Sequence, residues 1–214
     1  MADDFDSRLA DSGVVAIMRA HCSGQLIRAA EALLGGGVSV IEVAMTTPGA
    51  LRVIEEATSR FATALTFGAG TVIGAQSANA AIQAGAQFVV APNFDSETVD
   101  LCRRQGVPVI PGAYTPTEIV EAWQAGADLV KVFPASVGGP SFIAALRAPL
   151  PQVRLCAVGG ITLDNVGAFI NAGVEAVGVG GDLVNNQLLD AGDFVTITAR
   201  AQRFCEEIRR ARER

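Results

Sequence analysis

Eight short apolar runs, each followed by a stretch with helical periodicity, limit the fold of this chain more than any other feature. The runs are rich in Val, Ile, Phe and Ala and lie at residues 14–19, 38–44, 65–69, 87–91, 107–111, 129–133, 153–158 and 176–180. Apolar runs of this length are typical of parallel strands that are covered on both faces. The chain therefore predicts a parallel sheet with helices packed around it.

The segments between the runs carry apolar residues at intervals of three and four, as helices that cover a sheet do. They lie at residues 25–34, 48–60, 75–84, 96–105, 116–125, 141–147 and 163–172. Asp95 and Thr115 stand where helix N-caps are expected, and several segments end on glycine. Eight strand-and-helix units in 214 residues predict an α/β fold, a (β/α)8 TIM barrel forming one domain over residues 1–214. A doubly wound sheet is the alternative, but it seldom has such even spacing.

Composition excludes several function classes. The net charge of −6 argues against nucleic acid and anionic membranes as partners, and the basic run at residues 209–214 is interpreted as a solvated helical tail. No apolar run is long enough to span a membrane and the N-terminus is acidic, so we expect a cytoplasmic protein. One histidine, His21, and four scattered cysteines predict neither a metal site nor disulfides.

Lys131 is the most unusual residue of the chain. Fifteen of the sixteen basic residues are arginines, and the single lysine lies inside an apolar run. A desolvated lysine is able to lose its proton and attack a carbonyl group, whereas arginine stays protonated. The alternative is a lysine that extends from a strand end to water. The apolar neighbours on both sides favour a chemical role.

Strand parity brings two further charged residues to the same side as Lys131. Side chains alternate between the interior and exterior of a barrel, so Lys131, Glu42 and Arg19 are all able to point inward. Each lies near the C-terminal end of its strand, where barrel enzymes have their active sites. Three unrelated rim charges remain the alternative.

These parts predict a metal-free aldol cleavage. A lysine amine forms an iminium with a ketone, and that cation accepts the electrons of the bond that breaks two carbons away. Glu42 would transfer the protons, provided that burial raises the pKa of its carboxyl group toward neutral pH. Gly159 and Gly160 follow the seventh strand, and Gly180 and Gly181 follow the eighth. Barrels bind phosphate at these two loops through main-chain N–H groups.

The chain resembles the 2-keto-3-deoxy-6-phosphogluconate aldolases and, more closely, the sister 2-dehydro-3-deoxy-6-phosphogalactonate aldolases. The resemblance covers residues 14–184 and rests on the stretches at 41–43, 68–72, 88–93, 111–112, 131–135, 157–162 and 180–183. It implies a class I aldolase, a lyase without cofactor or metal, that yields pyruvate and D-glyceraldehyde 3-phosphate. The family is usually homotrimeric.

The resemblance also implies residue roles. Lys131 would form the Schiff base and Glu42 would be the general acid and base. Thr71 would hold the pyruvyl end, with Pro92 lining the wall and Phe133 packing against the substrate. The two glycine loops would bind the phosphate.

One position departs from the family pattern. Phosphogluconate-type members often carry an arginine four residues after the glutamate, where this chain has Thr46. Arg19 resembles the arginine that phosphogalactonate-type members have at the end of the first strand, and it would bind the substrate carboxylate in its place. The sugar acid therefore stays open between gluconate and galactonate types.

The sequence fits other barrel enzymes less well. Orotidine-type decarboxylases need Asp-x-Lys, and ribulose-phosphate-type epimerases need histidines and a metal. A 4-hydroxy-2-oxoglutarate aldolase and a non-catalytic phosphosugar-binding barrel remain alternatives, although the latter has no use for both Lys131 and Glu42.

Overall fold

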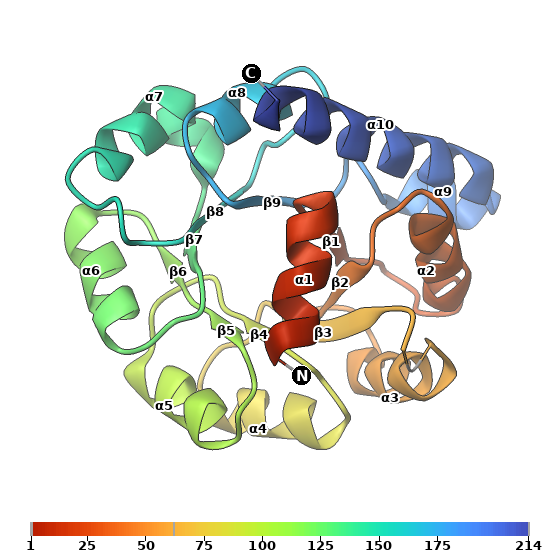
Figure 1. Ribbon diagram of the computed structural model, residues 1–214. Helices are drawn as coiled ribbons and strands as arrows, with labels where there is room; N and C mark the ends of the chain where they lie inside the picture. Colours follow the sequence, from red (N-terminus) through yellow and green to blue (C-terminus); the bar gives the residue numbers. More distant parts are fainter. Residues whose placement is uncertain (1, 62, 214) are drawn as a thin grey trace.

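The computed structural model describes residues 2–61 and 63–213, which form a barrel of parallel strands surrounded by helices (Figure 1). The strands are β1 (Val14–Met18), β2 (Val40–Ala44), β3 (Thr66–Gly70), β4 (Val89–Val90), β5 (Val109–Ile110), β6 (Gly112–Ala113), β7 (Val130–Val132), β8 (Leu155–Val158) and β9 (Ala176–Val179). Their order is β5-β4-β3-β2-β1-β9-β8-β7-β6. β5 and β6 are one run interrupted at Pro111, whose ring removes a main-chain donor, so the eight predicted strand positions are present.

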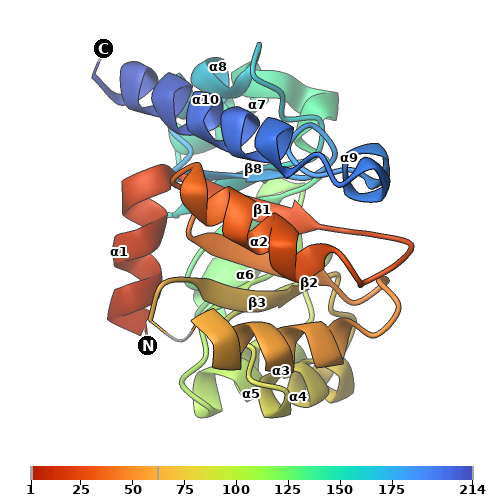
Figure 2. The same ribbon diagram turned by 90° about the vertical axis from the view of Figure 1, so that its right-hand side faces the viewer.

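Helices enclose the strands on the outside (Figures 1 and 2). They are α2 (Leu26–Gly35), α3 (Ala50–Phe61), α4 (Ala75–Gln83), α5 (Ser96–Arg104), α6 (Pro116–Gln124), α7 (Ala135–Arg147), α8 (Val166–Asn171), α9 (Asn186–Ala191) and α10 (Phe194–Arg212). The predicted caps are confirmed: Asp95 accepts from Thr98 N, and Thr115 forms a capping box with Glu118. The (β/α)8 barrel predicted from the sequence is thus the observed fold.

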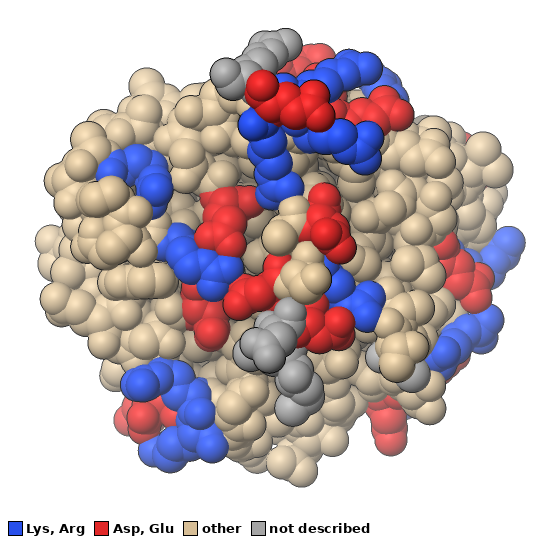
Figure 3. Space-filling view, in the orientation of Figure 1, with Lys and Arg blue, Asp and Glu red and all other residues tan. Residues whose placement is uncertain are grey.

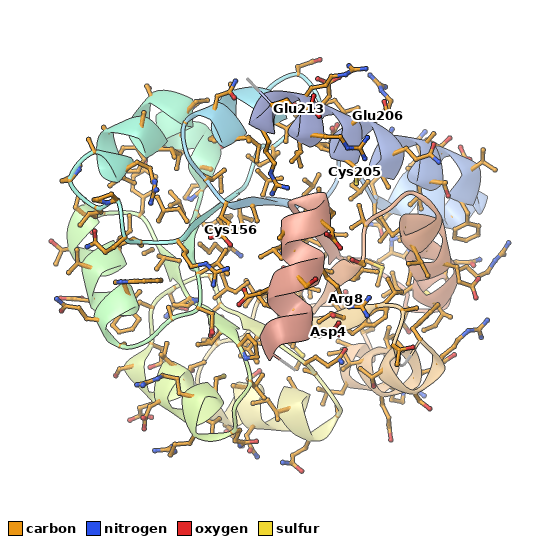
Figure 4. All side chains as sticks on the ribbon, in the orientation of Figure 1. Asp4, Arg8, Cys156, Cys205, Glu206 and Glu213 are labelled. Carbon is orange, nitrogen blue, oxygen red and sulfur yellow. The ribbon has the colours of Figure 1, made fainter. Side chains whose placement is uncertain are left out.

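The first helix, α1 (Ala2–Ser12), closes the N-terminal end of the barrel (Figures 1 and 2). Phe5 and Leu9 are buried in the interior cluster, and the ring of Phe5 lies 5.1 Å from that of Phe88. On its outer side, Arg8 pairs with Asp4 at 3.0 Å (Figure 4). The helical segments predicted from the sequence do not include this helix.

The interior follows the predicted strand parity. Val15, Val40 and Leu129 lie in the interior cluster, and the alternate residues pack outward against the helices. Glycine makes room where strands carry large side chains, since a Cβ at Gly68 would lie 2.6 Å from the Phe88 ring. Charged residues at the C-terminal ends of these strands therefore extend from an apolar, closely packed base.

The C-terminal helix packs its apolar residues against the barrel. Ile208 and Ala211 are buried, and Arg212 donates to the carbonyl groups of Ala10 and Glu175, at 2.5 and 3.1 Å. Acidic and basic side chains are intermixed around this helix and α1 (Figure 3). The helix therefore packs against the barrel through its apolar residues, while Arg209, Arg210 and Arg212 stay exposed as predicted. No helix within residues 2–61 and 63–213 is long and apolar enough to cross a membrane.

Candidate active site

A cavity of about 710 Å³ opens at the C-terminal end of the barrel. It is lined by all ten residues that the sequence analysis selected: Arg19, Glu42, Thr71, Pro92, Lys131, Phe133, Gly159, Gly160, Gly180 and Gly181. They come from seven different strands or the loops that follow them, so the fold alone brings them together. Their position agrees with the location of active sites in barrel enzymes.

Lys131 is the centre of β7 and is only 5% exposed. It is paired in register with Gly112 on one side and Cys156 on the other, so neither neighbour brings a charge beside it. Its Nζ atom lies 5.0 Å from the centroid of the Phe133 ring. The amine is thus largely shielded from water and lies beside an aromatic ring in the cavity wall, which suits a nucleophilic lysine.

Glu42 lies on β2 and is 2% exposed. Burial raises the pKa of this carboxyl group above its usual value, whereas the positive charges of Lys131 and, secondarily, Arg19 lower it. The effect of burial is the largest, so the pKa is raised overall. This is the direction that a carboxyl group needs to exchange protons near neutral pH.

Arg19 follows β1 and donates a hydrogen bond from Nη2 to Oγ1 of Thr71 at 3.1 Å. Thr71 follows β3 and has a φ of 58°, a left-handed conformation that is rare for a β-branched residue. Strained backbone of this kind gathers at functional sites. Thr46, by contrast, is exposed and does not line the cavity.

The glycine loops form the end of the cavity at β8 and β9. Gly159 and Gly160 have φ values of 95° and 75°, which other residues rarely adopt. A Cβ at Gly160 would lie 2.5 Å from Cβ of Ser136, whereas one at Gly181 would meet no atom within 4 Å. The first loop is therefore fixed by packing, and the second has open space beside it.

Sequence reasoning missed several residues at this end of the cavity: Ile161, Thr162, Asp182, Val184, Asn185 and Asn186. Some orient each other or the loops, since Asn185 caps α9 through Leu188 N and also donates to the carbonyl of Gly181. Asn186 accepts from the main-chain N–H of His21 at 3.2 Å. Their position directly after the glycine pairs was a usable signal, but a sequence does not show which of them turn toward the cavity.

The barrel and this site define a class I aldolase, an enzyme that works through an amine and without a metal. Among the described residues, no group of three or more His, Cys, Asp or Glu side chains is placed to hold a metal ion. The family model for KDPG and KHG aldolase matches residues 5–200. The chain belongs to this family and is a lyase.

Curated relatives agree with this assignment. The 2-dehydro-3-deoxy-phosphogluconate aldolase of Treponema pallidum is 40% identical over 81% of this chain and 82% of its own length. The 2-dehydro-3-deoxy-6-phosphogalactonate aldolase of Escherichia coli K12 is 33% identical over 92% of this chain and 95% of its own.

Solved structures show the same architecture. A structure described as native KDPGal superposes with a TM-score of 0.86 at 30% identity, over 94% of this chain and 96% of that one. The KDPG aldolase of Legionella pneumophila, captured with pyruvate as a covalent carbinolamine, gives a TM-score of 0.86 at 29% identity, over 92% and 96% of the two chains.

Proposed function

We propose that this enzyme cleaves a 2-keto-3-deoxy-6-phospho sugar acid to pyruvate and D-glyceraldehyde 3-phosphate, with Lys131 as the Schiff-base residue and Glu42 as the general acid and base. The observation that carries the proposal is the burial of one lysine and one carboxyl group in the same cavity. The carbinolamine reported for the Legionella pneumophila relative supports covalent chemistry with pyruvate.

The reaction follows from these two groups. The neutral amine of Lys131 attacks the C2 carbonyl of the substrate, and loss of water leaves an iminium cation. The Glu42 carboxylate takes the proton of the C4 hydroxyl, and the electrons of the C3–C4 bond move into the iminium to give an enamine. The aldehyde leaves, C3 of the enamine is protonated, and water hydrolyses the imine to release pyruvate.

The remaining cavity residues bind the substrate in this proposal. Arg19 binds the substrate carboxylate, with the Thr71 hydroxyl that it contacts at 3.1 Å as a second partner. Pro92 forms a wall beside the pyruvyl part, and Phe133 packs against the bound chain. Main-chain N–H groups of the loops at Gly159, Gly160, Gly180 and Gly181 bind the 6-phosphate.

Two sugar acids fit this chemistry. The relatives include phosphogluconate and phosphogalactonate aldolases, and one relative at 34% identity from Escherichia coli K12 is a KHG/KDPG aldolase, which keeps 4-hydroxy-2-oxoglutarate as an alternative substrate. The Arg19–Thr71 contact favours the phosphogalactonate type. It places an arginine where it is able to bind the substrate carboxylate, although position 46 carries a threonine instead of an arginine. A purely phosphosugar-binding role does not agree with membership of an aldolase family.

The assembly and location are part of the proposal. We expect a cytoplasmic homotrimer, and a neighbouring structure described as a cage built from fused symmetric oligomeric domains supports a multimer. Light scattering of the purified enzyme would determine the number of subunits.

Pyruvate release tests the proposal. The enzyme is mixed with each 6-phosphorylated epimer, and pyruvate is measured through reduction by lactate dehydrogenase. We expect cleavage of at least one epimer, with no loss of rate in EDTA. Absence of pyruvate with both epimers and with 4-hydroxy-2-oxoglutarate would contradict the proposal.

A further inference from the structure

The end of the cavity where a phosphate is expected contains a carboxylate. Among the described residues that line the cavity, the basic side chains are Arg19 and Lys131, and the acidic ones are Glu42 and Asp182. Arg19 bonds Thr71, and both cations act on Glu42, so they belong to the pyruvyl end. Asp182 lies at the other end and makes no salt bridge within the described part of the chain.

Asp182 directly follows the Gly180-Gly181 pair and is half-buried. Its Oδ2 atom accepts a hydrogen bond from the main-chain N–H of Leu163 at 3.3 Å, and Asn165 accepts from that of Thr162 at 2.9 Å. Both donors belong to the loop after β8. Without these side chains, both N–H groups would be free to donate hydrogen bonds to a bound phosphate. Here they donate to Asn165 and Asp182 instead.

The cation beside this loop is directed elsewhere. Arg200, on α10, donates from Nη1 to the main-chain carbonyl of Asp182 at 2.9 Å and does not line the cavity. Donors for an anion remain, because the N–H groups of Gly160, Ile161 and Gly181 have no acceptor among the described residues. A phosphate thus meets main-chain donors together with one opposing negative charge.

A carboxylate affects two kinds of substrate differently. It repels a phosphate that carries up to two negative charges, and the repulsion is stronger in a partly dehydrated cavity than in water. It accepts hydrogen bonds from the hydroxyl groups of an uncharged chain, and only one bond to the carboxylate of Asp182 is already formed. Asp182 therefore weakens binding of a phosphorylated substrate and strengthens binding of a substrate that ends in an uncharged hydroxylated chain.

We propose that Asp182 determines specificity at this end of the cavity by reducing the preference for a 6-phosphate. The enzyme then also cleaves 2-keto-3-deoxy acids that end in an uncharged polyhydroxyl chain. This proposal rests on the proposed function, since it concerns the distal end of the same cavity.

The test compares one sugar acid with and without its 6-phosphate. The measured quantity is the ratio of kcat/KM for the phosphorylated form to kcat/KM for the unphosphorylated form. Asp182→Asn keeps the shape and an acceptor for Leu163 N but removes the charge. We expect the ratio to rise about tenfold, the order expected for removing one nearby like charge. Asp182→Glu keeps the charge, so the ratio should stay near the wild-type value.

Asp164→Asn is the matched control. Asp164 lies on the loop after β8, is exposed and does not line the cavity, so its neutralisation changes the net charge equally without changing the cavity. The ratio should stay at the wild-type value. If Asp182→Asn fails to fold in a thermal melt, Asp182→Ser provides a second uncharged acceptor at the same position.

An unchanged ratio in the folded uncharged variant would overturn the proposal, as would an equal rise in Asp164→Asn. Borohydride trapping of pyruvate by the wild-type enzyme distinguishes failure of the proposed function from failure of the role of Asp182, because pyruvate has no distal chain. Absence of trapping contradicts the proposed function itself. Normal trapping with an unchanged ratio contradicts only the role of Asp182.

Discussion

Gly70 leaves the space that the carboxyl group of Glu42 occupies. A Cβ atom at Gly70 would lie 2.6 Å from Cδ of Glu42, closer than real Cβ contacts allow. In the register of β2 and β3, Gly70 pairs with Ala44 and Glu42 pairs with Gly68. The Glu42 side chain therefore extends from the level of Gly68 toward the C-terminal mouth of the barrel, where the cavity opens.

Gly70→Ala should displace this carboxyl group. We expect kcat for cleavage to fall by about 10- to 100-fold, because a shift of about 1 Å in a catalytic group has effects of this order. Gly167→Ala on α8 is the control, since its Cβ would make an ordinary contact of 3.8 Å with Ala211. Wild-type kcat in a folded Gly70→Ala variant would show that Glu42 needs no fixed position.

Activity should decline at acidic pH with an apparent pKa above 4.5, the usual value for glutamate, because burial raises the pKa of Glu42. Below that pKa the carboxyl group is protonated and unable to take the C4 hydroxyl proton, so kcat/KM falls as the pH falls. Glu42→Gln should lose about 10²- to 10⁴-fold in rate. Its pH–rate profile should also lose the acidic limb, which is the fall in kcat/KM at low pH. A limb that persists unchanged in Glu42→Gln would belong to another group.

Arg19→Ala should weaken pyruvate and the full sugar acid to the same extent, since both carry the carboxylate that Arg19 is proposed to bind. The positive charge of Arg19 lowers the pKa of Glu42, so its removal should also move the acidic limb upward. Binding is measured by the pyruvate concentration needed for borohydride trapping. If only the pH profile moves, Arg19 acts on Glu42 alone.

Gly181→Val should obstruct the approach of the phosphate. The added side chain meets no atom within 4 Å and requires no unusual φ, so the loop should keep its shape. We expect a higher KM for the phosphorylated substrate, with little change in slow deprotonation of pyruvate. Gly160→Val is a poorer test, because its φ of 75° and the 2.5 Å approach to Ser136 would distort the loop itself. Equal damage by Gly181→Val to both reactions would assign the loop a structural role.

The sequence predicted the barrel and the inward position of Lys131 and Glu42, because parallel strands alternate their side chains strictly. It did not predict α1, whose Phe5 and Leu9 are buried only because the end of the barrel is open to receive them. Nor did it select Asp182, since the direction of a loop side chain depends on contacts such as that with Leu163. The alternation of residues along a strand predicts which side chains point inward, whereas the contacts of loops and termini depend on the completed fold.

Borohydride trapping with pyruvate tests the central claim most directly, since only a reactive amine forms a reducible imine. We predict a single covalent adduct of pyruvyl mass on the wild-type enzyme, located by peptide mapping at Lys131. Lys131→Arg should give no adduct and no cleavage while remaining folded, because the guanidinium group stays protonated. An adduct at another residue, or appreciable turnover by Lys131→Arg, would contradict the Schiff-base role of Lys131.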